Sequence, residues 1–218
     1  MPESFTPTER TRVVREPHRG VYDRLEIYKI LDEGFVCHVG FTAADAQPLV
    51  IPTLYARVDD AIYFHGSAAS RMLRGAAAGV PVCVTVTLTD GLVLARSVFN
   101  HSMNYRSVVA LGNATLVDVT AEKLEALHAF TEKILSGRWE DARQPNEKEL
   151  KATSILKLPL TEISAKVRSG PVQDDEEDYA LPVWAGIVPL RLQAAAPIRD
   201  ERCDPAIPTP AYAANYRR

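Results

Sequence analysis

The residues best suited to chemistry lie in one segment, Ile62–Arg74, where a strand-like run ends in hydroxyl groups and two arginines follow. Ser67 is a favourable helix N-cap, and the alanine-rich residues that continue to Gly79 predict a short helix. The free N–H groups and the dipole at such a helix start, together with the guanidinium of Arg71 or Arg74, can hold a phosphate. The same pattern also fits a capped helix that carries two surface arginines, so the segment alone leaves both interpretations open.

The cysteines and histidines do not indicate metal chemistry. The five histidines, at positions 18, 38, 65, 101 and 128, are scattered and form no H-E-x-x-H pattern. Cys37 and Cys83 lie in apolar strand-like runs and Cys203 lies near the end of the chain, without the C-x-x-C spacing of a zinc site. We therefore predict buried, reduced thiols and no dedicated metal site.

The elements that must position these residues are mostly strands. In chain order we predict a helix that Asp23 and Glu26 cap and Gly34 ends, strands Phe35–Thr42, Leu49–Val58 and Ala61–His65, the helix at 67–79, strands Val82–Leu88 and Leu92–Val98 paired as a hairpin, a strand Ser107–Val119, a helix Thr120–Leu135 and a strand Ile155–Val167. Six or more strands in mostly antiparallel succession favour a closed or nearly closed barrel over a doubly wound sheet. Neither a dinucleotide-binding nor a P-loop glycine motif is present in the sequence.

Composition and charge limit the class of protein. The 218 residues, 46% of them hydrophobic and 24% charged, fit one globular domain. We place that domain at 21–193, after an N-terminal arm at 1–20 and before an extended Pro/Ala-rich tail at 194–218. A net charge of −3 gives no electrostatic reason to bind nucleic acid or an anionic membrane. Because the sequence shows neither a signal peptide nor a membrane-spanning apolar run, we expect a cytoplasmic protein.

Three blocks of the sequence, Gln47–Arg57, Ile62–Arg74 and Leu88–Gly112, resemble a known family in their order and spacing. This is the family of FMN-binding split barrels that includes pyridoxamine 5'-phosphate oxidase and the nitroimidazole-resistance flavoproteins. The resemblance implies a mainly β (α+β) fold, a six-stranded antiparallel split β-barrel with short flanking helices. It also implies a homodimer with FMN at the subunit interface.

The resemblance assigns the phosphate of FMN to the second block. Ser70 and Arg71 match the family's Ser-Arg-Lys run, with help from Ser67, and Met72 stands where the family has lysine. Arg74 lies one helical turn further on and is a candidate replacement for that lost charge.

The other two blocks are expected to contact the flavin ring and to reach it from the second subunit. Thr53 and Tyr55 alternate on the strand that lies along the flavin in the family, although the same alternation fits core packing. Tyr105, Arg106 and Ser107 match the strand that enters from the partner, with Ser107 in place of the family's glutamine.

His65 is the candidate catalytic residue, because nitroimidazole-resistance proteins carry a histidine near the flavin in a similar place. An imidazole there can donate to the flavin or relay a proton to a substrate. The alternative is a histidine at the end of a strand that only bonds a backbone carbonyl.

The predicted function is that of an FMN-dependent oxidoreductase, nitroreductase-like, that reduces a small-molecule acceptor. One alternative is a flavin- or haem-binding protein without turnover, for which His65, His101 or His18 would be the axial ligand. A second alternative is pyridoxamine 5'-phosphate oxidase itself. The C-terminal third does not resemble the substrate-binding end of that enzyme, which counts against it.

Overall fold

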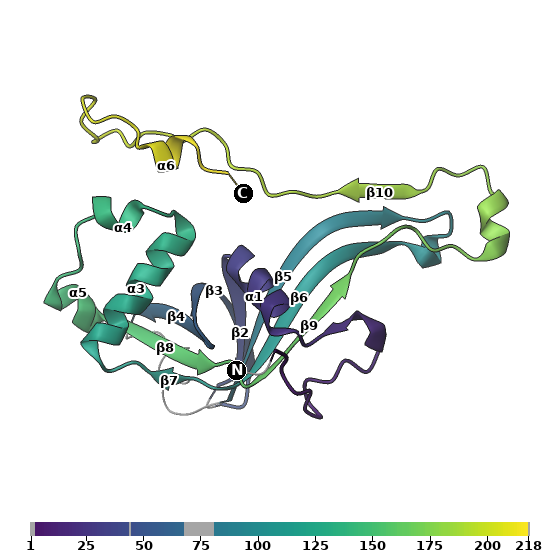
Figure 1. Ribbon diagram of the computed structural model, residues 1–218, viewed down its shortest axis with the longest axis horizontal. Helices are drawn as coiled ribbons and strands as arrows, with labels where there is room; N and C mark the ends of the chain where they lie inside the picture. The colour runs from purple at the N-terminus through teal and green to yellow at the C-terminus, as the bar shows by residue number, and fades with distance from the viewer. Residues whose placement is uncertain (1–2, 44, 68–80, 218) are drawn as a thin grey trace.

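The fold is built on one open, antiparallel β-sheet (Figure 1). The computed structural model describes residues 3–43, 45–67 and 81–217. The strands are β1 (Gly20–Val21), β2 (Val36–Thr42), β3 (Pro48–Val58), β4 (Ala61–Ser67), β5 (Pro81–Leu94), β6 (Ser102–Asn113), β7 (Thr115–Leu116), β8 (Thr153–Pro159), β9 (Glu162–Arg168) and β10 (Gly186–Pro189). Their order is β1-β9-β6-β5-β2-β3-β4-β8-β7, with β10 on the edge of β5, and the sheet does not close. This arrangement confirms a mainly β fold of the split-barrel kind.

The helices are short, and α1, α3 and α5 contact the sheet. They are α1 (Arg24–Glu33), α3 (Thr120–Ile134), α4 (Arg138–Asp141), α5 (Glu147–Ala152) and α6 (Ala211–Ala214), with 3-10 turns η1 (Pro17–Arg19), η2 (Val98–Asn100) and η3 (Glu176–Ala180). Asp23 caps α1 as its sequence predicts, since its carboxylate accepts the Glu26 N–H at 2.9 Å. In the part of the chain that the structure describes, no helix is long and apolar enough to cross a membrane.

Strand β3 is shared between the two halves of the sheet. Its first residues pair with β2 as far as Leu54, opposite Val36, and its last residues pair with β4 from Tyr55, opposite Phe64. The strand therefore changes partners within one residue step. Beyond Phe64 the β4 strand continues on β8 alone, up to Ser67 opposite Thr153, which opens the barrel at the end of β4.

Three strands predicted from the sequence have different boundaries in the structure. The strand predicted at Ser107–Val119 is β6, which begins at Ser102 and ends at Asn113, followed by the short β7. The chain does not turn at Thr89–Gly91, because β5 runs through these residues with a bulge that leaves Asp90 out of the register with β6. The hairpin turn lies instead between β5 and β6. The predicted strand Ile155–Val167 is two strands, β8 and β9, since Pro159 has no N–H to donate and the Leu160 N–H bonds to the Asp60 carbonyl at 2.8 Å.

Two apolar clusters hold the sheet and its helices together. Ile27 and Leu31 of α1 are fully buried against the inner face of the barrel, where they pack with Cys37 and its neighbours. Burial raises the pKa of the Cys37 thiol to about 12, which disfavours the reactive thiolate. Cys37 is buried as the sequence predicts, whereas Cys83 is only half-buried. A smaller cluster joins Phe130 of α3 to Tyr63 of β4.

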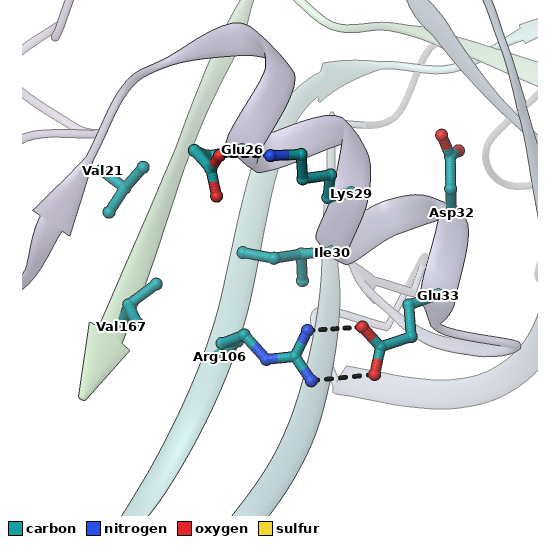
Figure 2. Close-up of a pocket in the computed structure, with 8 residues that line it drawn as sticks. All are labelled: Val21, Glu26, Lys29, Ile30, Asp32, Glu33, Arg106 and Val167. Carbon is teal, nitrogen blue, oxygen red and sulfur yellow. Dashed lines mark hydrogen bonds and ion pairs between the residues drawn. The ribbon is translucent and has the colours of Figure 1, made fainter. Parts of the chain in front are cut away.

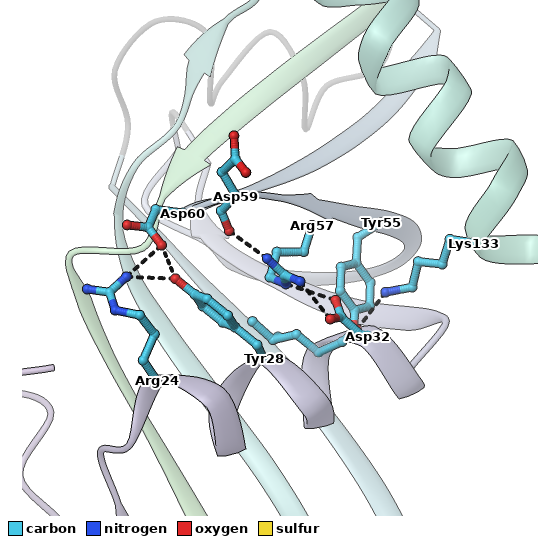
Figure 3. A network of polar contacts seen from close by, with 9 residues as sticks. Arg24, Tyr28, Asp32, Tyr55, Arg57, Asp59, Asp60 and Lys133 are labelled. Atoms are coloured by element: carbon cyan, nitrogen blue, oxygen red, sulfur yellow. Dashed lines mark hydrogen bonds and ion pairs between the residues drawn. The ribbon is translucent and has the colours of Figure 1, made fainter. Parts of the chain in front are cut away.

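Polar contacts fix α1 over the turn between β3 and β4 (Figure 3). Asp60 accepts hydrogen bonds from Arg24 at the start of the helix and from Tyr28 one turn later. Arg57 of β3 binds Asp32 near the helix end through two hydrogen bonds of 2.8 and 2.6 Å. Because these contacts lie at both ends of α1, they set its position on the sheet.

The last turn of α1 also receives two donors from other elements. The Leu31 carbonyl accepts the Tyr55 hydroxyl at 2.5 Å and the Lys133 ammonium at 2.6 Å. The ammonium lies 3.7 Å from the centroid of the Tyr55 ring, in a cation–π contact. One backbone oxygen therefore links α1, β3 and α3.

We expect Gly34→Ala to destabilise the protein by about 1–3 kcal/mol, because overpacking a filled core has that cost. A Cβ at Gly34 would lie 2.6 Å from a methyl of Val86 and 2.8 Å from the Tyr55 hydroxyl. At Gly40 the nearest atom would be 3.5 Å away, so Gly40→Ala is the matched control and should change stability by no more than ~0.5 kcal/mol. Urea unfolding measures both, and equal midpoints would contradict this account.

Candidate functional site

The end of β4, where the barrel opens, holds the candidate catalytic histidine. The side chain of His65 lies under α3 and stacks on the ring of Phe130, with centroids 4.4 Å apart. Its Nδ1 is buried and has no hydrogen-bond partner among the described residues. Burial lowers the pKa of His65, so the neutral imidazole is favoured. A buried, unpartnered ring nitrogen is costly and is a feature expected of a site that receives a ligand.

The predicted phosphate-binding residues follow directly in the chain. Ser67 closes β4 through backbone pairing with Thr153. Ser70, Arg71 and Arg74, with the helix predicted for 67–79, lie outside the described residues. The structure therefore gives the point at which this segment leaves the sheet, at the open end of the barrel.

Thr53 and Tyr55 lie on one face of β3, as their alternation predicts, and that face is the inner one. Tyr55 is 1% exposed and its hydroxyl is bonded to the Leu31 carbonyl. Thr53 is half-buried opposite Cys37 of β2, one step before β3 passes to β4. Of the two, Thr53 is the less buried.

Arg106 lies on the inner face of β6 at the wall of a cavity of about 580 Å³ beside α1 (Figure 2). Its guanidinium binds Glu33 at the end of α1 and also Asp90 in the bulge of β5, the latter at 2.9 and 2.7 Å. Hydrogen bonds to Glu33 and Asp90 raise the pKa of Arg106. A flavin that bound Arg106 across a dimer interface, as the sequence predicts, would have to compete with the two carboxylates that Arg106 already binds.

Ser107 and Tyr105 lie on the other face of the same strand. The Ser107 hydroxyl donates to the Lys166 carbonyl of β9 at 3.2 Å, and Tyr105 pairs with Thr89 and Arg168. The three consecutive residues that the sequence assigned to one site therefore lie on opposite faces of β6, since Arg106 points to the barrel interior and Tyr105 and Ser107 point away from it.

The outer face of β2, β3, β5 and β6 presents apolar side chains to solvent, and we call it the open sheet face. Cross-strand pairing places on it Val36, His38, Val50, Leu54, Thr85 and Val109. Val50 is 66% exposed and Val36 is 43% exposed, which is unusual for valines inside a sheet. His38 was missed by sequence reasoning, although its alternation with the buried Cys37 and Val39 was the available signal.

Asp174 is a second residue that the sequence did not single out. The acidic run at 174–178 resembles a solvated loop, yet the Asp174 side chain is fully buried and binds Arg96 at 2.9 Å. Burial by itself would raise the pKa of Asp174, but the hydrogen bonds from Arg96 and Ser97 outweigh it and lower that pKa. Among the described residues, no group of three or more His, Cys, Asp or Glu side chains could hold a metal ion.

We expect His65→Phe to reduce the acid sensitivity of the fold. Because burial lowers the pKa of folded His65, the unfolded chain binds the proton more readily, with a pKa near about 6.5. The stability that depends on a neutral imidazole is thus present above about pH 6.5 and is lost as the pH falls through the lowered pKa. Phenylalanine keeps the stacking on Phe130 and cannot titrate. Thermal unfolding of the cofactor-free protein at about pH 7 and pH 5 should show a smaller loss for His65→Phe than for the exposed control His128→Phe, and equal losses would show that His65 does not contribute to the acid sensitivity.

Comparison with known proteins gives the family. The model of pyridoxamine 5'-phosphate oxidase matches residues 23–167. The flavocytochrome Anf3 from Azotobacter vinelandii is 41% identical, with a TM-score of 0.90 over 96% of this chain and 97% of that one. The FAD and haem binding protein from Mycobacterium smegmatis is 34% identical, with a TM-score of 0.85 over 89% and 95% of the two chains.

A putative 5-nitroimidazole antibiotic resistance protein from Bacteroides thetaiotaomicron shares the fold, at 21% identity and a TM-score of 0.58 over 68% of this chain and 86% of that one. The search of curated proteins gave no match. The family match and the two full-length structural matches agree with the open, split sheet described above. The chain belongs to the pyridoxamine 5'-phosphate oxidase-like family of split-barrel proteins.

Proposed function

We propose that this protein is a redox protein that binds a flavin and a haem. The observation that carries the proposal is its 41% identity, over 96% of the chain, to a flavocytochrome. The 34% identical relative from Mycobacterium smegmatis is named for FAD and haem and supports the same pair of cofactors. The bound flavin would supply hydride and single-electron chemistry, and the protein would position it and exclude solvent.

The flavin phosphate is assigned to the segment after β4. In the sequence, Ser67 ends β4 and Ser70, Arg71 and Arg74 follow it, and hydroxyl and guanidinium groups are the donors that a phosphate requires. FMN and FAD share the phosphate that this segment would hold. The sequence suggested FMN, whereas the relative named for FAD favours the dinucleotide, and we therefore propose FAD.

His65 is the residue that we propose for the haem iron. Imidazole is a common axial ligand, and the sequence offered His65, His101 and His18 for that role. His18 and His101 are exposed, and His101 Nδ1 already meets the Ala95 N–H. His65 is partly buried, its Nδ1 has no hydrogen-bond partner among the described residues, and it precedes the predicted flavin-phosphate segment in the sequence. If His65 instead acts on the flavin as a proton donor, its removal should slow reduction while both cofactors stay bound.

The protein is proposed to act as an oxidoreductase on a small-molecule acceptor, within a homodimer. The open sheet face supports the dimer, because a second copy would cover exposed valines such as Val50 and Val36. Storage of the cofactors without turnover is the alternative.

We expect the purified protein to show flavin bands and a Soret band, and the flavin bands to bleach when a nicotinamide donor or another low-potential donor is added. In His65→Ala the Soret band should be lost while the flavin bands remain, whereas the exposed control His128→Ala should keep both. Absorption spectra of the two variants, compared with that of the unsubstituted protein, test this prediction. Flavin without a Soret band in the unsubstituted protein, even after reconstitution with haem, would overturn the haem part of the proposal.

We expect a homodimer of twice the 24.0 kDa chain mass, and Val50→Asp should convert it to a monomer. A buried carboxylate without a partner is strongly unfavourable in an interface. Val98→Asp is the control, because Val98 is 86% exposed and lies outside the open sheet face. Light scattering coupled to gel filtration measures the mass, and a monomeric unsubstituted protein with full cofactor content would exclude the shared interface.

A further inference from the structure

A buried arginine without a carboxylate partner lies at the end of β9. Arg168 is only 9% exposed. Its guanidinium donates to the Asn104 side-chain carbonyl, and the Asn104 amide donates in turn to the Gly170 carbonyl at 3.1 Å. Among the described residues, no carboxylate forms an ion pair with it, in contrast to Arg106, which has two.

An uncompensated buried charge is costly, and proteins normally pair such a charge with a group of opposite sign. The surroundings of Arg168 increase the cost, because Arg19 brings a second positive charge near it. Burial and the charge of Arg19 lower the pKa of Arg168. An anion bound near both guanidinium groups would offset both effects.

A cavity of about 200 Å³ lies at this position. It is lined by His18, Arg19, Val167, Arg168, Ser169, Gly170, Pro171 and Gln173. No acidic side chain lines it, although the chain as a whole has more acidic than basic residues. Arg19 has a carboxylate within 3.5 Å, that of Glu16, but this carboxylate lies outside the cavity lining.

We propose that this cavity binds an oxyanionic group, a carboxylate or a phosphate, between Arg168 and Arg19. Guanidinium groups match the planar, two-oxygen geometry of carboxylate and phosphate, and a volume of this size suits one such group and not a whole cofactor. The site lies on β9 and the 3-10 turn η1, whereas the predicted flavin-phosphate segment follows β4. It does not depend on the flavin and haem proposal.

The site makes the N-terminal arm part of a binding function. Residues 17–19 form η1, which packs on β9, and they contribute Arg19 and His18 to the cavity. The arm is held in place by further contacts, such as the Thr8 hydroxyl to the Glu162 carboxylate at 3.0 Å. Occupation of the cavity would therefore tie the arm more firmly to the sheet.

Thermal unfolding of the full-length protein in inorganic phosphate, with sodium chloride used to hold the ionic strength constant, tests the proposal. A ligand that binds the folded state raises the unfolding temperature with concentration, and acetate serves as the carboxylate probe. We expect Arg19→Gln to weaken the response to phosphate at least tenfold, as the loss of a charge-assisted hydrogen bond implies. Arg15→Gln removes the same charge from the same arm outside the cavity and should leave the response unchanged.

Arg168→Gln should abolish the response, since it retains an amide that can bond to Asn104 but carries no charge. Arg19→Gln keeps the test decisive if Arg168→Gln does not fold, because the Arg19 side chain is 25% exposed. The proposal is overturned if phosphate and acetate stabilise no more than chloride does, or if Arg19→Gln and Arg15→Gln respond alike.

Cofactor-binding measurements on the same variants identify the source of the anion. A loss of FMN affinity in Arg19→Gln without a loss of riboflavin affinity assigns the cavity to a flavin phosphate. A loss of haem affinity without a loss for its dimethyl ester assigns the cavity to a propionate. Unchanged affinity for all four, with a weakened response to phosphate, assigns the cavity to a separate small anion such as a substrate.

Discussion

The exchange of partners along β3 is the constraint on which the rest of the structure depends. A strand that pairs with β2 up to Leu54 and with β4 from Tyr55 must leave one end of β4 without that neighbour. On its other edge, β4 stays paired with β8 as far as Ser67. The open end that results is where the chain leaves the sheet into the predicted phosphate segment. The position of this open end therefore follows from strand pairing before any side chain is considered.

Side chains then hold the opened sheet in one arrangement. The Leu31 carbonyl of α1 accepts hydrogen bonds from β3 and α3, and Asp60, in the turn between β3 and β4, accepts hydrogen bonds from α1. These bonds attach α1 to β3, to the β3–β4 turn and to α3. The Asp60 contacts are partly shielded from solvent, since the Arg24 side chain is 15% exposed, which makes them more effective than ion pairs on an open surface. The Tyr55 hydroxyl donates to the Leu31 carbonyl, and this bond explains why a residue predicted to meet a flavin lies in the core.

Much of the fold could be predicted because periodicity reports which face of an element is buried. The alternation of Cys37 and Val39 with exposed neighbours, and the cap at Asp23, gave β2 and α1 nearly to the residue. The boundary at Thr89–Gly91 could not be predicted, because a Thr-Asp-Gly run suits a turn and a bulge equally. What decides between them is the neighbouring strand β10, which is remote in sequence and packs on Gly91.

The candidate site was less predictable because its charges are defined by tertiary partners. Arg106 and Arg168 are alike in sequence, since each is a strand arginine followed by a serine. In the structure Arg106 meets Glu33 and Asp90, whereas Arg168 meets a neutral amide. The first arginine is neutralised within the chain and contributes to holding α1 on β6. The second retains an unbalanced charge in a cavity, and the difference between them follows from which carboxylates the strand register brings within reach.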